Sequence, residues 1–131
     1  MTRFLLVAAG GAIGSMARYG LGVAAGRWAP NAGWPVGTFA CNMIGGLLMG
    51  LLAGWLSFRG GAQQDSVRLF AAVGVVGGFT TFSSYSLEAA QMIERRQIGL
   101  AAAYVIGSVV LAVGALFVGL AVARRAFGVS V

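Results

Sequence analysis

The chain has 131 residues, of which 59% are hydrophobic and only 9% are charged, and its mean hydropathy is +0.88. Because a soluble domain carries about a quarter of its residues as charges, this composition excludes a soluble protein and predicts an integral membrane protein. All nine basic residues are arginines, scattered along the chain rather than clustered. Such arginines typically contact anionic lipid headgroups, so we expect membrane lipid as a partner and no nucleic acid.

The first apolar run spans about residues 4–26 and contains one charge, Arg18. A secretory signal has a shorter apolar core, so we interpret this run as the first membrane-spanning helix. Arg18 lies on a stripe of small residues whose four-residue spacing lets helices pack closely in lipid. An arginine inside the membrane is costly. It either faces a water-filled vestibule, where it attracts anions, or extends to the headgroups. The stripe consists of Gly10, Gly14, Gly22 and Gly26.

Three further spans are predicted at residues 36–58, 67–94 and 98–123. Each is near or above the roughly 20 residues that cross a bilayer as a helix. The connectors are short and polar, which leaves no room for a soluble domain and places both termini on one side of the membrane. The sequence therefore predicts an all-α membrane protein with four transmembrane helices that form a single domain over residues 1–131.

Orientation in the membrane follows the distribution of basic residues. The terminal side carries Arg3, Arg59, Arg68, Arg124 and Arg125, and the opposite side carries Arg27, Arg95 and Arg96. This bias is weak, so we expect the chain to insert both ways and to form an antiparallel, dual-topology homodimer. A single orientation with the termini inside is the alternative.

Several kinds of chemistry are excluded by residues that are scarce or missing. Cys41 is the only cysteine and the chain has no histidine, which excludes metal sites of the Cys/His type and histidine-based catalytic triads. No phosphate-binding loop that opens on a lysine is present. We therefore do not expect an enzyme.

Polar side chains within the spans are candidates for a site. Asn42 lies in the charge-free second span, and Tyr104 and Ser108 are four residues apart on one face of the fourth. Each either bonds a neighbouring helix or offers donors to a permeating ion. Residues 77–88 read Gly-Gly-Phe-Thr-Thr-Phe-Ser-Ser-Tyr-Ser-Leu-Glu. Such a hydroxyl-rich stretch is tolerated in the membrane where it is buried in protein or lines a wet cavity, so it predicts a pore or a binding site.

This stretch resembles the signature of the small bacterial fluoride channels, the Fluc or CrcB family. The resemblance covers nearly the whole chain, including Gly14 and Arg18 in the first span and the Gly37-Thr38 pair at the start of the second. It implies passive export of fluoride across the bacterial inner membrane, which lowers cytoplasmic fluoride. It also implies an antiparallel dimer in which the third helix breaks at its middle, near residues 77–81.

The resemblance also implies roles for individual residues. Backbone carbonyls at Gly77 and Thr80 of both chains are expected to hold one structural sodium ion at the dimer interface. Each dimer is expected to have two fluoride paths, along which the positive edge of an aromatic ring contacts the anion. We assign to the path Asn42, Phe82, Tyr85, Thr81, Tyr104, Ser108 and Arg18.

Two positions of the motif need separate expectations. The family usually has phenylalanine where this chain has Tyr85, whose hydroxyl adds a donor and bulk. Glu88 matches the motif, but an ionised carboxylate would repel fluoride. We expect it to be protonated or bonded to hydroxyls on a neighbouring helix. The serines among residues 83–86 are expected to bond carbonyls one turn back.

Two functions of other classes remain as alternatives. A small proton-coupled drug exporter is also a four-helix antiparallel dimer, but it relies on a glutamate in the first helix, and residues 4–26 contain no acid. A membrane scaffold subunit needs packing glycines but no hydroxyl–aromatic motif.

Overall fold

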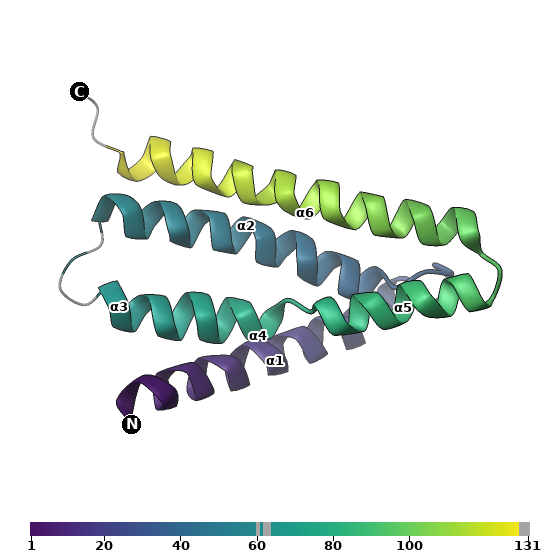
Figure 1. Cartoon of the computed structure of the whole chain (residues 1–131), viewed down its shortest axis with the longest axis horizontal. Coiled ribbons are helices and arrows are strands. Elements are labelled where there is room, and N and C mark those ends of the chain that lie inside the picture. The colour runs from purple at the N-terminus through teal and green to yellow at the C-terminus, as the bar shows by residue number, and fades with distance from the viewer. Residues whose placement is uncertain (60, 62–63, 129–131) are drawn as a thin grey trace.

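The computed structural model describes residues 1–59, 61 and 64–128. Over these residues the chain is entirely helical, with no strand, and four helical stretches are long and apolar enough to cross a membrane. These stretches run antiparallel in sequence order, and the start of the first and the end of the last lie at the same end of the bundle (Figure 1). The prediction of a four-helix membrane protein is confirmed. The spans are Thr2–Trp28 (α1), Val36–Phe58 (within α2, Val36–Arg59), Gln64–Glu94 and Ile98–Phe127 (α6).

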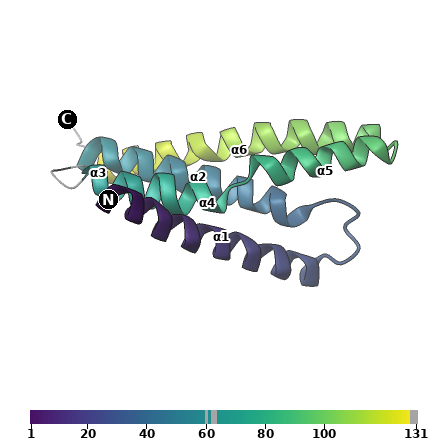
Figure 2. The same cartoon turned by 60° about the horizontal axis from the view of Figure 1, so that its bottom comes forward.

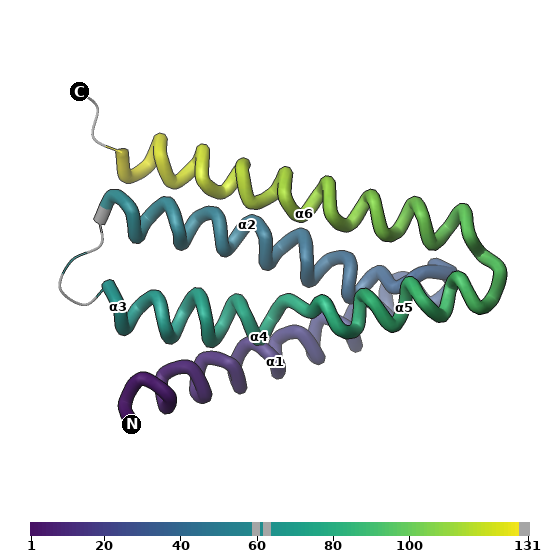
Figure 3. Tube along the Cα trace, viewed as in Figure 1, coloured from purple at the N-terminus to yellow at the C-terminus, as the bar shows by residue number. Residues whose placement is uncertain are grey.

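The third crossing consists of several segments. It begins with α3 (Gln64–Val67), continues as the π-helical η1 (Arg68–Val76) and the short α4 (Gly77–Phe79), and ends with α5 (Phe82–Glu94). Between α4 and α5, Thr80 has φ −78° and ψ 157°, and Thr81 has φ −148° and ψ 114°. This extended backbone appears as a short connection without helical turns in the tube view (Figure 3). Two adjacent β-branched residues favour such a conformation.

Close packing against α1 holds the first half of this crossing. A Cβ atom at Gly14 would overlap the carbonyl oxygen of Val75, and one at Gly74 would lie 2.9 Å from the Cα atom of Gly10. The two backbones therefore touch, as the glycine spacing predicts. Beyond this region α1 diverges from the third crossing (Figure 2) and lies against the start of α2, where a Cβ atom at Gly37 would be 3.1 Å from the Cα atom of Gly22.

The buried core lies between α5 and α6. It consists of Tyr85, Ala89, Met92, Ala101 and Tyr104, and the partly buried Trp34 and Phe39 pack against it. Most other large apolar side chains of α6 are exposed, as expected for a helix in lipid. The core therefore fixes α5, and with it the second half of the third crossing, against α6.

Candidate functional site

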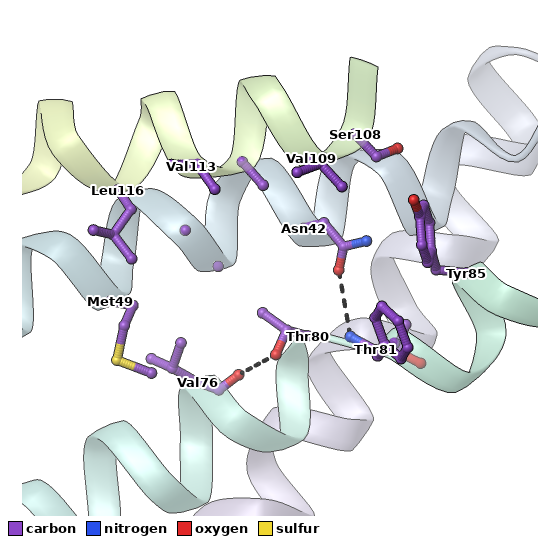
Figure 4. Close-up of a pocket in the computed structure, with 14 residues that line it drawn as sticks. Asn42, Met49, Val76, Thr80, Thr81, Tyr85, Ser108, Val109, Val113 and Leu116 are labelled. Carbon is purple, nitrogen blue, oxygen red and sulfur yellow. Dashed lines mark hydrogen bonds between the residues drawn. The ribbon is translucent and has the colours of Figure 1, made fainter. Parts of the chain in front are cut away.

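The start of α5 is held by two side-chain hydrogen bonds. The backbone N–H of Thr81 donates to Oδ1 of Asn42, on α2, at 3.4 Å (Figure 4). Oγ1 of Thr81 accepts from the backbone N–H of Ser84 at 3.2 Å. Thr81 is thus a normal N-cap. These bonds replace helical ones and keep the two halves of the third crossing apart.

The same bonds free particular carbonyl groups. In a continuous helix Thr81 N–H would donate to the carbonyl of Gly77, and Ser84 N–H would donate to that of Thr80. Both donors are diverted, so among the described residues these two carbonyls receive no such bond. Of the two carbonyls between them, that of Gly78 accepts from Nε of Arg18 at 3.3 Å. The carbonyls left free are the two that the sequence resemblance implied as cation ligands.

The orientation of the Asn42 amide follows from the bond to Thr81. Because Oδ1 accepts from a backbone N–H, the Nδ2 group must lie on the other side of the amide. Figure 4 shows it directed towards the space near Tyr85 and Ser108. Nδ2 makes no hydrogen bond within the part of the chain that the structure describes. Two N–H donors therefore remain available.

These groups line one cavity of about 400 Å³ between α2, α6 and the third crossing. Apart from Thr80, Thr81 and the residues of α5, its wall is mostly apolar and includes Met49, Val113 and Leu116. Ser108 is only 2% exposed, and its Oγ has no hydrogen-bond partner among the described residues. A buried hydroxyl without a partner is costly, so Ser108 has a donor available for a group that enters the cavity. The cavity brings together five predicted path residues: Asn42, Thr81, Phe82, Tyr85 and Ser108.

The two aromatic residues of the motif differ in exposure. Phe82 is 79% exposed and Tyr85 is 8% exposed, and their ring centroids lie 5.6 Å apart with planes tilted by 40°. The hydroxyl of Tyr85 donates to the carbonyl of Val105 on α6 at 3.1 Å. The added hydroxyl is therefore directed at a neighbouring helix and not at the cavity.

Tyr104 and Glu88 belong to a separate polar cluster. The Tyr104 hydroxyl donates to Oε2 of Glu88 at 2.7 Å, and the Thr38 hydroxyl donates to Oε1 at 2.7 Å. The expectation that Glu88 bonds hydroxyls on neighbouring helices is confirmed. Tyr104 is buried and lies outside the cavity that contains Ser108. No role was predicted for Thr38. The only sequence feature that pointed to it was its place in the Gly37-Thr38 pair.

Arg18 faces a second cavity, between α1, α2 and α5, where α1 diverges. Its half-buried side chain shares this cavity with Thr38, Cys41 and Glu88. Thr81 lines both cavities, so the two adjoin at the start of α5. Arg18 is therefore turned into the protein instead of towards the headgroups.

The hydroxyls of α5 only partly follow the expected pattern. Ser86 donates to the carbonyl of Phe82 one turn back at 2.8 Å, as predicted. For Ser84 the prediction is wrong, because its Oγ accepts from the hydroxyl of Thr81 at 3.1 Å. Ser83 lies 3.5 Å from the same Thr81 oxygen. At a helix start no carbonyl one turn back is in helical position, so these serines gather around the N-cap.

Comparison with known proteins identifies the family. The profile of the family described as CrcB-like protein, Camphor Resistance (CrcB) matches residues 5–120. A relative from Phenylobacterium zucineum, named fluoride-specific ion channel FluC, is 64% identical over 127 residues, which cover 97% of this chain and 99% of the relative. Relatives of the same name from Caulobacter sp. strain K31 and Novosphingobium aromaticivorans are 59% and 53% identical, over 98% and 95% of this chain and 100% and 98% of their own. The chain therefore belongs to the CrcB family.

Proposed function

We propose that this protein is a fluoride-selective channel of the bacterial inner membrane that lets fluoride leave the cell down its gradient. The observation that carries the proposal is the set of unpaired donors, Asn42 Nδ2 and Ser108 Oγ, that face one cavity beside the interrupted third crossing. The names of the relatives supply the ion. Release of fluoride from liposomes, with chloride as the control ion, tests the proposal.

The chemistry of the cavity suits fluoride. Fluoride is small, strongly hydrated and accepts hydrogen bonds only, so its water must be replaced by N–H and O–H donors. Asn42 Nδ2 and the Ser108 hydroxyl provide such donors, and no charged side chain among the described residues lines this cavity. A pore must also release its ion. Neutral donors and the positive edges of aromatic rings attract the anion without holding it as tightly as an arginine would.

The second cavity serves as the approach to this site. Arg18 supplies the positive charge that raises the local concentration of anions. Glu88 lines the same cavity, but two hydroxyls donate to its carboxyl oxygens, so both oxygens already have hydrogen-bond partners. The N-terminus of α5, at Thr81, adds the positive end of a helix dipole where the two cavities meet. An anion therefore meets increasingly favourable electrostatics on its way inward.

We also propose that two chains form an antiparallel dimer. Phe82, Ser83 and Ser86 are exposed on one face in the middle of the third crossing. Hydroxyls in mid-membrane favour contact with protein over contact with lipid. The weak arginine bias permits both orientations.

A labelling experiment tests this orientation. In a chain that carries Cys41→Ser, a single cysteine placed at Thr2 is expected to react with a membrane-impermeant reagent from both faces of intact cells or vesicles, about half from each. Labelling from one face only would contradict dual topology.

A sodium ion at the dimer centre fits the free carbonyls of Gly77 and Thr80. Carbonyl oxygens are ligands for hard cations, and interrupted membrane helices bind sodium in this way. Two carbonyls from each of two chains would surround the ion, which we assign a structural role. Replacing sodium by N-methylglucamine is then expected to lower the melting temperature of the dimer. An unchanged melting temperature would contradict the sodium site and leave the fluoride path untouched.

A further inference from the structure

The buried hydroxyl of Ser108 makes no bond to its own helix, unlike three other hydroxyls of this chain. A serine or threonine in a helix ordinarily bonds the carbonyl three or four residues earlier. Three hydroxyls do so here, each to the carbonyl four residues earlier: Ser57 at 2.9 Å, Thr80 at 3.3 Å and Ser86 at 2.8 Å. Ser108 is buried, lines the cavity and has no partner among the described residues. Its hydroxyl is therefore kept off its own helix.

Only two carbonyls of α6 are in reach of Ser108 in the usual way, those of Tyr104 and Val105. The Val105 carbonyl accepts from the hydroxyl of Tyr85 at 3.1 Å. As a carbonyl within α6 it also faces the N–H four residues further on. A carbonyl oxygen has two lone pairs, so these two donors saturate it. Tyr85 thus removes one of the two backbone carbonyls that could accept a hydrogen bond from Ser108.

We propose that Tyr85 is a positioning residue for Ser108: by occupying the Val105 carbonyl, its hydroxyl leaves Ser108 a single carbonyl of its own helix to bond, that of Tyr104, and so favours donation to fluoride. The inference rests on the proposed function and assigns a role to the position where this chain departs from the usual phenylalanine. A hydroxyl that rests on a backbone carbonyl must give up that bond before it donates to an ion. Occupying one of the two carbonyls in advance makes this step less frequent during permeation.

The substitution Tyr85→Phe isolates the hydroxyl. The ring of Tyr85 is held between Phe82 and Tyr104, with centroid distances of 5.6 and 5.3 Å. Phenylalanine is therefore expected to keep the ring in place while it opens the Val105 carbonyl to Ser108. The free energy of one neutral hydrogen bond changes a rate or equilibrium constant by a factor of about three to ten. The fluoride flux of the variant is therefore expected to fall by that factor.

A double-mutant cycle tests whether Tyr85 acts through Ser108. Fluoride efflux is compared for wild type, Tyr85→Phe, Ser108→Ala and the double variant, and is followed for hours so that slow channels are resolved against empty liposomes. Tyr85→Phe is expected to slow efflux when Ser108 is present and to have no effect in the Ser108→Ala background. Ser86→Ala is the matched control, since it removes a hydroxyl that already bonds a carbonyl, and in that background Tyr85→Phe should act as in wild type.

Melting temperatures separate this role from a purely structural one. Loss of the bond between α5 and α6 should lower the melting temperature of Tyr85→Phe equally in both Ser108 backgrounds, whereas the effect on flux should require Ser108. Unchanged flux in Tyr85→Phe, or the same decrease with and without Ser108, would overturn the inference. Either result leaves the proposed function standing, because that function is tested by the fluoride and chloride fluxes through the wild type.

Discussion

Replacing Asn42 with aspartate is expected to reduce fluoride flux by roughly tenfold to a hundredfold, the range of a hydrogen bond to a charged group. Oδ1 of Asn42 accepts from the N–H of Thr81, and its Nδ2 group is free. Aspartate keeps the acceptor, so the start of α5 stays capped. It replaces the two N–H donors by a carboxylate oxygen, which cannot donate to fluoride and repels it.

The control for this variant is Asn31→Asp, which adds the same charge in the exposed loop between α1 and α2. It is expected to conduct as the wild type does. Both variants should elute as dimers and melt within a few degrees of the wild type. Normal flux through a folded Asn42→Asp dimer would mean that Asn42 does not contact the ion.

The second large effect is expected at Phe82. Substitution by isoleucine keeps an apolar side chain of similar reach but removes the aromatic edge, so fluoride flux should fall by up to about tenfold, the upper end of the scale of an aromatic edge contact. Because the side chain is 79% exposed in the single chain, the substitution creates no cavity in the protomer. The fold should therefore be retained.

Phe117 provides the matched comparison. It is also an exposed phenylalanine, at 64%, but it lies on α6 and lines neither of the two adjoining cavities. Phe117→Ile is expected to leave fluoride efflux unchanged. If Phe82→Ile and Phe117→Ile had the same effect, the ring of Phe82 would serve packing and not permeation.

The four spans and the location of the site could be predicted because they depend on local properties of the sequence. The number of crossings follows from the length of apolar runs, and the hydroxyl-rich stretch at residues 77–88 stands out from them. An amide in an otherwise apolar helix indicates that Asn42 either bonds a neighbouring helix or offers donors to an ion, and its amide does the first with its oxygen and leaves its N–H donors for the second. What was not predictable is that its oxygen accepts from the N–H of Thr81 at the start of α5, since that depends on the register of two helices that meet across 39 residues of chain.

The positions of Tyr104 and Tyr85 show the limit of periodicity arguments. Tyr104 and Ser108 share a helical face, but long side chains on a helix lean towards its N-terminus. The Tyr104 hydroxyl therefore reaches Glu88, away from the cavity of Ser108. Likewise, spacing places Tyr85 beside Phe82 but does not say where its hydroxyl points. Only the packing of α5 on α6 directs it to Val105.

Fluoride efflux from liposomes that contain the purified protein tests the central claim most directly. The liposomes are loaded with fluoride or chloride, a potassium ionophore clamps the voltage, and electrodes record release of each ion. The account predicts rapid fluoride release, while chloride is retained. Chloride release at a similar rate would contradict selectivity, and an absence of fluoride release from well-folded dimers would contradict the channel itself.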